Sequence, residues 1–224
     1  MYIPKIAWSY SVLTSFESCA WRHYILRVSK QVVEKKSEHQ VWGERVHKAF
    51  EHRILKKTPM PAGMEAYEKY VTPLESHPGE LVAEQKMALN AAFEPVTWFA
   101  KDVWVRGITD VTKFSESGTR AFIGDWKTGR PDPDSAQLRL TAVMTMHQRP
   151  EVEQVTNAFV WLKTGTITRE AFTRDQIPSI WQGFAPRVAR LEHAMATNQW
   201  PKKPSGLCRN WCPVGKALCE HCGS

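Results

Sequence analysis

Two acidic residues and a lysine near the middle of the chain have the types and spacing needed to cleave a phosphodiester bond. Asp110 follows the largely apolar residues 103–109, and Asp125 and Lys127 follow residues 121–124. Alternate residues of a strand face the same side, so Asp125 and Lys127 are predicted to point into one site. Carboxylates bind hard divalent cations, and a neighbouring lysine can position a water molecule. The pattern predicts metal-assisted hydrolysis, although exposed hairpins also carry such residues without this activity.

A turn-rich segment, residues 115–118, lies between the two runs and predicts a hairpin that brings the carboxylates together. Upstream, residues 41–56 are predicted to form a helix, because apolar residues share one helical face: Val46, Ala49 and Phe50. His47 and Glu51 lie four positions apart on another face. A neutral imidazole is a common metal ligand, so His47 is a candidate ligand. A histidine that binds no metal is the more frequent alternative.

In chain order these patterns are GxxxHxxxE, GxxD and DxKTG, followed by a helical glutamine. The order resembles the RecB-like branch of the PD-(D/E)XK nuclease superfamily, over about residues 11–219. That branch includes the nuclease domains of bacterial recombination helicase–nucleases, CRISPR-associated RecB-like exonucleases and small phage exonucleases. The resemblance implies these metal ligands: His47, Asp110, Asp125 and the main-chain carbonyl of Trp126. It also implies that Lys127 is the catalytic lysine.

Three further positions are compared with that family. Gln137 matches the glutamine of the QxxxY motif, which orders the active site and contacts DNA, so the resemblance implies a catalytic role for it. The tyrosine of that motif is replaced by Thr141, a departure from the family pattern. Glu84 lies where the family often has an acidic residue on the first core strand. A solvated strand charge is an equally good interpretation of Glu84.

The five cysteines require an explanation of their own. Cys19 stands alone near the start, and the others crowd the last 17 residues: Cys208, Cys212, Cys219 and Cys222. Disulfides are rare in the cytosol, where this protein is expected, so four thiols in a short tail predict a metal site. Thiolates suit both iron–sulfur clusters and zinc.

Two ligand sets remain open for these thiols. The family resemblance implies a [4Fe–4S] cluster held by one early and three late cysteines: Cys19, Cys208, Cys212 and Cys219. The late spacings here are each one residue longer than the usual family pattern. The alternative is a zinc knuckle formed by Cys208, Cys212, Cys219 and Cys222 (or His221), with Cys19 as a buried free thiol. A third interpretation is that some of these cysteines bind nothing.

Composition favours a polyanionic partner. The chain of 224 residues has a formal net charge of +7, 10 tryptophans and a pI near 9.2. A basic surface attracts nucleic acid, and exposed tryptophans can stack on bases, although a basic pI also serves solubility. No apolar run reaches transmembrane length and no signal peptide is recognised, so a cytoplasmic protein without membrane association is expected, in the host cytoplasm if phage-encoded.

The periodicity predicts an α/β fold with a central mixed sheet of four or five strands and helices on both faces, and the resemblance implies that this fold is of the PD-(D/E)XK type. Strands are expected at residues 81–89, in the hairpin 103–127 and in a second hairpin, 153–173. Helices are expected at residues 11–28, 41–56, 64–74, 135–147 and 175–198, with a polar loop at 29–40. Residues 1–200 would form the nuclease domain. Residues 201–224 would form a cysteine-rich tail that binds its metal together with Cys19.

The resemblance implies a Mg²⁺- or Mn²⁺-dependent DNA exonuclease in recombination, repair or phage DNA processing. Such an enzyme would act on free ends or single strands, with a helicase, a single-strand-binding protein or a recombination protein as partner. Two alternatives stay open: a non-catalytic DNA-binding scaffold that retains the fold, and a zinc-containing nucleic-acid-binding adaptor whose cysteine tail is the working part.

Overall fold

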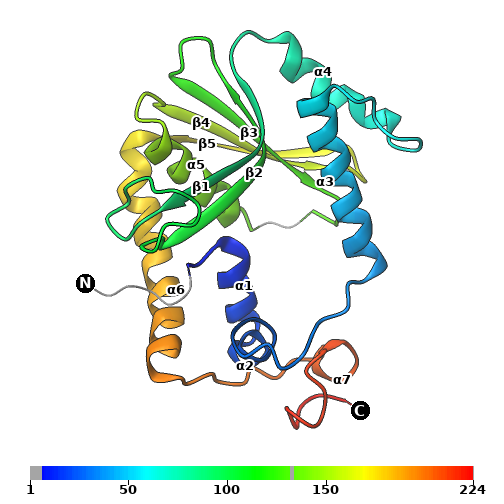
Figure 1. Ribbon diagram of the computed structural model, residues 1–224, viewed down its shortest axis with the longest axis vertical. Coiled ribbons are helices and arrows are strands. Elements are labelled where there is room, and N and C mark those ends of the chain that lie inside the picture. Colours follow the sequence, from blue (N-terminus) through cyan, green and yellow to red (C-terminus); the bar gives the residue numbers. More distant parts are fainter. Residues whose placement is uncertain (1–6, 132–133, 224) are drawn as a thin grey trace. The chain divides into compact units, whose positions relative to one another are not determined.

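The computed structural model describes residues 7–131 and 134–223, and its internal contacts divide the chain into two units (Figure 1). Unit 1 comprises Ser37–Gln182 with Met1–Ala7, and unit 2 combines Trp8–Lys36 with Gly183–Ser224. The division predicted from the sequence, at residue 200, stays a prediction. Within the described residues, no helix is both long enough and apolar enough to cross a membrane.

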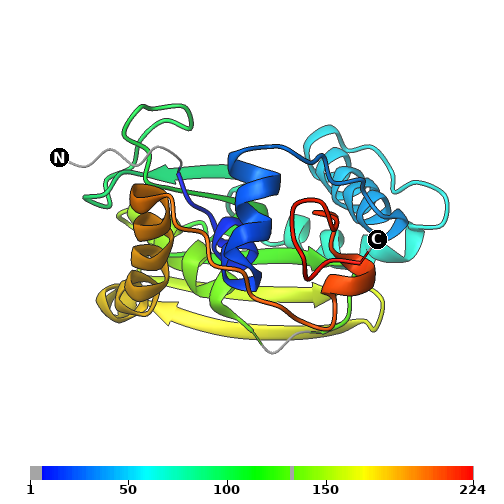
Figure 2. The same cartoon turned by 90° about the horizontal axis from the view of Figure 1, so that it is seen from below.

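Unit 1 is built on a five-stranded mixed sheet, which confirms the predicted α/β class and its central mixed sheet. The strands lie side by side in chain order: β1 (Leu81–Leu89), β2 (Val105–Phe114), β3 (Arg120–Lys127), β4 (Gln154–Trp161) and β5 (Thr166–Thr173). Neighbouring strands are antiparallel except β3 and β4, which are parallel. A parallel pair needs a crossover, and α5 (Ala136–Gln148) supplies it. Figure 2 shows the same strands from a second direction.

The other helices of unit 1 are α3 (Glu38–Lys56) and α4 (Glu68–Ser76), with a short 3₁₀ turn, η2 (Glu65–Tyr67), before α4. A second 3₁₀ turn, η3 (Arg174–Gln176), precedes α6 (Ile177–Thr197). The predicted loop at 29–40 is too long, because α3 already begins at Glu38. Ser37 accepts a hydrogen bond from the Gln40 backbone, and the Gln40 side chain accepts one from the Ser37 backbone. This capping box satisfies two donors of the first turn.

In unit 2, the helix predicted at residues 11–28 is broken. It forms α1 (Tyr10–Ser18), α2 (Ala20–His23) and one π-helical turn, η1 (Tyr24–Val28). Cys19, between α1 and α2, is extended at φ −166° and ends the first helix. The cap of α1 is Ser9, whose side chain accepts a hydrogen bond from the backbone of Val12. A short helix, α7 (Cys208–Trp211), lies in the cysteine tail.

The partly buried environment of His147, near the end of α5, predicts that the stability of unit 1 depends on pH. The indole of Trp181 donates a hydrogen bond to Nε2 of His147 at 3.1 Å, so this nitrogen must be unprotonated. Burial, and then the charge of Arg174, lowers the pKa of His147 from 6.5. The folded protein therefore binds fewer protons than the unfolded chain as the pH falls below about 6.5, and stability is lost with acidification.

We expect the midpoint of urea unfolding, followed by tryptophan fluorescence, to fall between pH 7.5 and pH 5. The fall should be smaller in His147→Gln, whose amide can still accept from Trp181. An equal fall in both proteins would show that His147 does not carry the effect.

Candidate active site

The predicted carboxylates lie near the point where two strands separate. The antiparallel ladder between β2 and β3 runs from Phe114↔Ala121 to Val111↔Gly124 and ends there. Beyond this point β2 continues through Asp110 without pairing to β3. The backbone N–H of Trp126 on β3 instead donates to Oδ2 of Asp110 at 2.7 Å. The sequence suggested that Asp110 ends its strand. In the structure Asp110 instead lies inside β2, at the fork between the strands.

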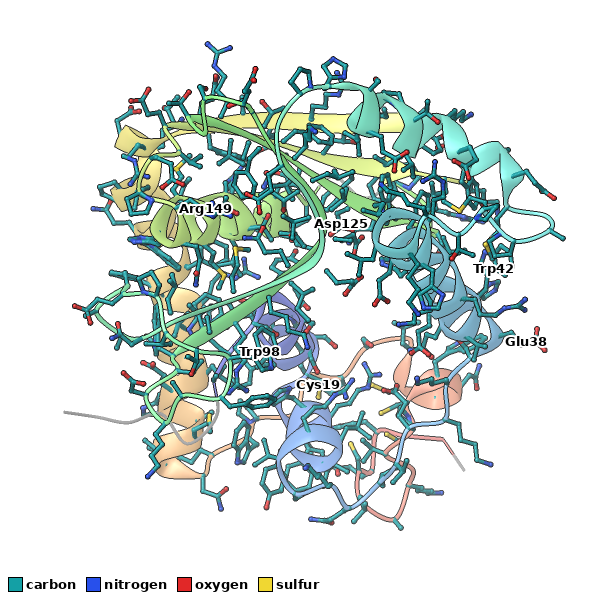
Figure 3. All side chains as sticks on the ribbon, turned by 45° about the horizontal axis from the view of Figure 1, so that its top comes forward. Cys19, Glu38, Trp42, Trp98, Asp125 and Arg149 are labelled. Carbon is teal, nitrogen blue, oxygen red and sulfur yellow. The ribbon has the colours of Figure 1, made fainter. Side chains whose placement is uncertain are left out.

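Alternate residues of β3 face opposite helices. Asp125 and Lys127 both contact Gln137 at the start of α5, whereas Trp126 between them stacks on Phe50 of α3 at 4.1 Å between ring centroids. This confirms that Asp125 and Lys127 share a face. Figure 3 labels Asp125 in this part of the sheet.

Asp125, Lys127 and Gln137 form a closed triangle. Nζ of Lys127 lies 2.8 Å from Oδ1 of Asp125 and donates to Oε1 of Gln137 at 2.9 Å. The amide of Gln137 donates to the second oxygen, Oδ2, of Asp125. Burial raises the pKa of Asp125 to about 6 against the lowering effect of the Lys127 charge. The lysine is therefore held by two oxygens at the end of the strand, in the position that the sequence predicted.

His47 reaches the site because α3 packs on the sheet. The core of this face joins Val46, Ala49 and Phe50 to residues of the strands, among them Val111 and Trp126. Nδ1 of His47 lies 3.0 Å from Oδ1 of Asp110. Burial tends to lower the pKa of His47, but the hydrogen bond and charge of Asp110 outweigh it and raise the pKa above 6.5. The stacked Phe50 and Trp126 thus fix the helix that carries His47.

Glu84 completes a cluster that the sequence left undecided. Ligand atoms of His47, Glu84 and Asp110 all lie within 4.8 Å of one another, and this is the one such group of three within the described residues. Burial, and then the nearby charges of Asp110 and Glu51, raises the pKa of Glu84. Two carboxylates and an imidazole at this separation are a suitable donor set for a divalent cation, which would offset the repulsion between the acids.

The backbone at Glu84 explains how this side chain reaches the cluster. Met87 faces α5, since the hydroxyl of Thr145 contacts its sulfur at 3.5 Å, whereas Ala83 packs in the core with α3. Residues four apart share a face in a regular strand, so β1 turns over between them. The turn lies at Glu84, whose φ is +50°. Such a conformation costs on the order of 1–3 kcal/mol in a residue other than glycine and is concentrated at functional sites.

Close contacts explain why two positions of the motifs are glycine. A Cβ on Gly43 would lie 3.3 Å from the hydroxyl of Thr128, so the glycine of GxxxH lets α3 approach the DxKTG segment. A Cβ on Gly107, the glycine of GxxD, would lie 2.9 Å from the sulfur of Met144 on α5. The motifs therefore encode helix–sheet packing as well as chemistry.

The structure brings most, but not all, of the predicted residues into one arrangement. His47 and Asp110 form the three-residue cluster with Glu84, whereas Asp125 is engaged by Lys127 and Gln137. Trp126 contributes its N–H, to Asp110. Thr141 is buried in α5, where it accepts from Asn157 at 2.8 Å and donates to main-chain oxygens, so it supports the helix and does not replace the family's tyrosine.

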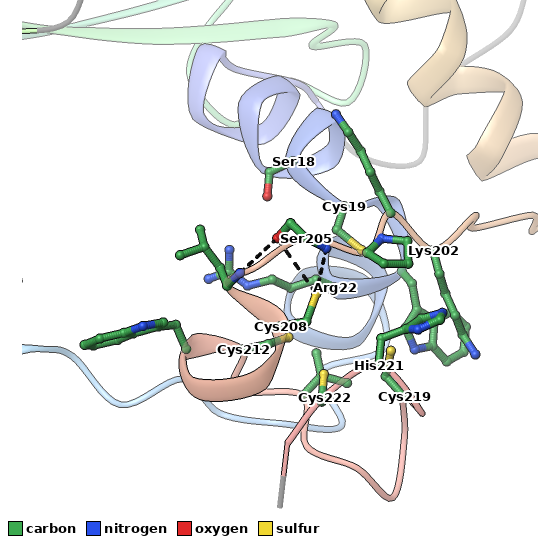
Figure 4. A pocket seen from close by; sticks show the side chains of 16 residues that line it. Ser18, Cys19, Arg22, Lys202, Ser205, Cys208, Cys212, Cys219, His221 and Cys222 are labelled. Atoms are coloured by element: carbon green, nitrogen blue, oxygen red, sulfur yellow. Dashed lines mark hydrogen bonds between the residues drawn. The ribbon is translucent and has the colours of Figure 1, made fainter.

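In unit 2, all five cysteines are free thiols and line one cavity of about 250 Å³ (Figure 4). Arg22, Lys202 and Lys203 line it as well. Cys222 is buried, and burial followed by hydrogen bonds with Cys212 and Cys219 raises the pKa of its thiol to about 12. The thiol of Cys19 and those of the C-terminal cysteines, about 200 positions apart in the sequence, therefore face the same cavity.

Comparison with known proteins shows which family the chain belongs to. The sequence model of the PD-(D/E)XK nuclease superfamily matches residues 7–220. A comparison with curated proteins gives no match. Among solved structures, a protein of Eubacterium rectale that is provisionally described as an exonuclease has a TM-score of 0.50 at 12% identity, over 92% of this chain and 86% of that one. The structure of SSO0001 has a TM-score of 0.49 at 12% identity, over 100% and 91%.

The family match spans nearly the whole chain, and it includes the sheet, both flanking helices and the cluster of acids, histidine and lysine at the strand fork. The structural likeness to the Eubacterium rectale protein supports the fold. This chain belongs to the PD-(D/E)XK nuclease superfamily.

Proposed function

We propose that the protein is a metal-dependent DNA exonuclease of the RecB-like branch. The observation that carries this proposal is the cluster of His47, Glu84 and Asp110 at the strand fork, beside the Asp125–Lys127 pair. Mg²⁺ or Mn²⁺ fits this donor set, because oxygen atoms dominate it and one imidazole is tolerated. When bound, such an ion polarises the scissile phosphate and acidifies a water molecule.

The residues have separable roles in this proposal. Asp110 and Glu84 would hold the cation with His47, and the Trp126 N–H fixes the Asp110 carboxylate. The carbonyl of Trp126 remains a candidate ligand by resemblance alone. Asp125 already accepts two hydrogen bonds, but a carboxylate has about four acceptor sites and can also reach a cation. Lys127 orients the attacking water and stabilises the charge that develops on the phosphate.

Gln137 acts through its neighbours, since its amide bridges Lys127 and Asp125. Its side-chain oxygen holds the ammonium group of Lys127 in place at the end of β3. Exonuclease rather than endonuclease action, and a role in recombination, repair or phage DNA processing, rest on the RecB-like resemblance. A helicase, single-strand-binding or recombination partner is part of the same proposal.

For the cysteines we propose a [4Fe–4S] cluster bound by Cys19, Cys208, Cys212 and Cys219. The support for this set is that Cys19 lines the same cavity as the cysteines of the tail, and a zinc knuckle within the tail would not require Cys19. The zinc set with Cys222 is the alternative.

The nuclease assay uses DNA substrates that differ only in whether they have ends. We expect end-labelled linear DNA to be degraded in the presence of Mg²⁺ or Mn²⁺ and to survive in EDTA, while covalently closed circular DNA is spared. Cutting of the circle would assign an endonuclease. No cleavage of any substrate, in any metal, would reject the catalytic proposal and favour a non-catalytic nuclease fold.

Removal of a proposed ligand should change the metal requirement. We expect His47→Ala and Glu84→Gln each to raise the Mn²⁺ concentration for half-maximal cleavage roughly tenfold or more, with activity partly recovered at high Mn²⁺. Glu116→Gln, in the exposed turn between β2 and β3, is the control and should leave the titration unchanged. A wild-type titration curve in both ligand variants would remove them from the metal site.

A further inference from the structure

The net charge of the chain is confined to one of its two units. Unit 2 contains 11 lysines and arginines against 4 acidic residues, so it accounts for the whole surplus of +7. Unit 1, which carries the candidate active site, contains 19 basic and 19 acidic residues and is formally neutral. A charge difference of this size between parts of one chain indicates that the basic part binds a polyanion.

Three of the four acidic residues of unit 2 form ion pairs with cations of the same unit. Glu17 is held by Arg187 and Arg190, at 2.7 and 3.2 Å, and Glu34 by Arg22 at 2.7 Å. Glu220 pairs with Lys202. Other cations are exposed and form no ion pair within the described residues: Lys35, Arg209 and Lys216. These three are available to phosphate groups.

Contacts within unit 2 bring the early and late segments together around the cysteine cavity. Val32, shortly before Lys35, packs with Val214 and Cys222 in one apolar cluster. Glu34 binds Arg22, which lines the same cavity as Trp211. Lys35 therefore belongs to the surface that the tail also builds.

Exposed apolar side chains accompany these cations. Trp211, at the end of α7, is 76% exposed, and Leu207 just before that helix is 65% exposed. Arg209 lies between them in the sequence. An indole left in solvent on a basic unit is a suitable surface for stacking an unpaired base, and successive bases of a duplex are not accessible in this way.

From these observations we propose that unit 2 is the DNA-holding unit and that it binds single-stranded DNA. Lys35, Arg209 and Lys216 contact phosphates, and Trp211 stacks on a base. The inference rests on the proposed action on DNA and adds a division of labour to it. The candidate active site is rich in carboxylates, which repel a polyanion. The affinity for the strand is therefore supplied by the other unit.

The test measures binding without cleavage, with a fluorescein-labelled oligothymidylate in EDTA. In the triple variant Lys35→Ala, Arg209→Ala, Lys216→Ala, we expect at least about tenfold weaker binding. The slope of log affinity against log salt should become shallower by about 2, since each single-strand phosphate contact contributes about 0.7. The matched control is the unit 1 triple Lys101→Ala, Lys163→Ala, Arg169→Ala, which removes the same charge from exposed positions. It should bind nearly as the wild type does.

Trp211→Ala should weaken binding about five- to a hundredfold without changing the salt slope, because base stacking is not ionic. Leu55→Ala, 56% exposed on α3, is its control. Equal losses in the two triple variants, or no loss in Trp211→Ala, would overturn the assignment. A wild-type protein that binds the oligonucleotide through unit 2 but never cleaves DNA would reject the nuclease proposal and leave this inference standing.

Discussion

Replacement of Lys127 by alanine is expected to slow DNA cleavage by about a hundred- to ten-thousandfold, which is the usual effect of removing a positioned electrostatic or acid–base group. Asp125→Asn should have an effect of the same order, since it removes the negative charge that holds Nζ of Lys127 at 2.8 Å. Rates are measured on end-labelled DNA at saturating Mn²⁺. Lys163→Ala, in the exposed turn between β4 and β5, is the matched control and should be fully active.

Stability must be followed alongside the rates. Lys127 is partly exposed and Asp125→Asn retains the shape of a largely buried side chain, so thermal unfolding of both variants should stay close to that of the wild type. The assignment of the active site would be wrong if both folded variants cut DNA within a few-fold of the wild-type rate. Loss of cleavage together with loss of fold would be tested again with Lys127→Arg, which keeps the charge and alters its geometry.

The second large effect concerns the thiols of unit 2. Binding of a structural metal contributes on the order of 10 kcal/mol to the folding of small metal-binding domains, so removal of one ligand can disorder the segment that depends on it. We expect Cys19→Ala to lose iron and the brown colour after anaerobic purification, and its tail to become sensitive to protease. Cys208→Ala should behave in the same way, because both residues would bind the same group.

Cys222→Ala distinguishes the two ligand sets. It is buried beside Cys212 and Cys219, yet only the zinc knuckle requires it. We expect this variant to retain its iron and colour. A Cys222→Ala protein without metal, together with a Cys19→Ala protein that still binds zinc, would replace the cluster by the knuckle. Neither result would alter the nuclease site, whose residues all belong to unit 1.

Local patterns in the sequence were sufficient for several parts of the site. The alternation of a strand put Asp125 and Lys127 on one face, and the turn at residues 115–118 made the hairpin predictable. Helical spacing separated His47 from the apolar face of α3, which packs as expected. These features repeat over two to four residues, so the information lies within one short segment.

Other features depend on contacts between segments that are distant in the sequence. Glu84 joins the cluster because β1 turns over at this residue to satisfy α5 on one side and α3 on the other. Asp110 lies at a fork whose position is set by the end of the β2–β3 ladder. Neither the positive φ nor the fork has a signal in the residue types.

The sequence by itself determined which residues could do chemistry, namely the acids, the histidine, the lysine and the cysteines, together with the α/β class of the fold. Only the tertiary structure decided how they are grouped. It places Glu84 close to His47 and Asp110. Asp125 instead contacts Lys127 and Gln137. The basic residues of two distant segments lie in one unit. The physical reason is that residue spacing fixes the face of one element, whereas the packing of several elements fixes which faces meet.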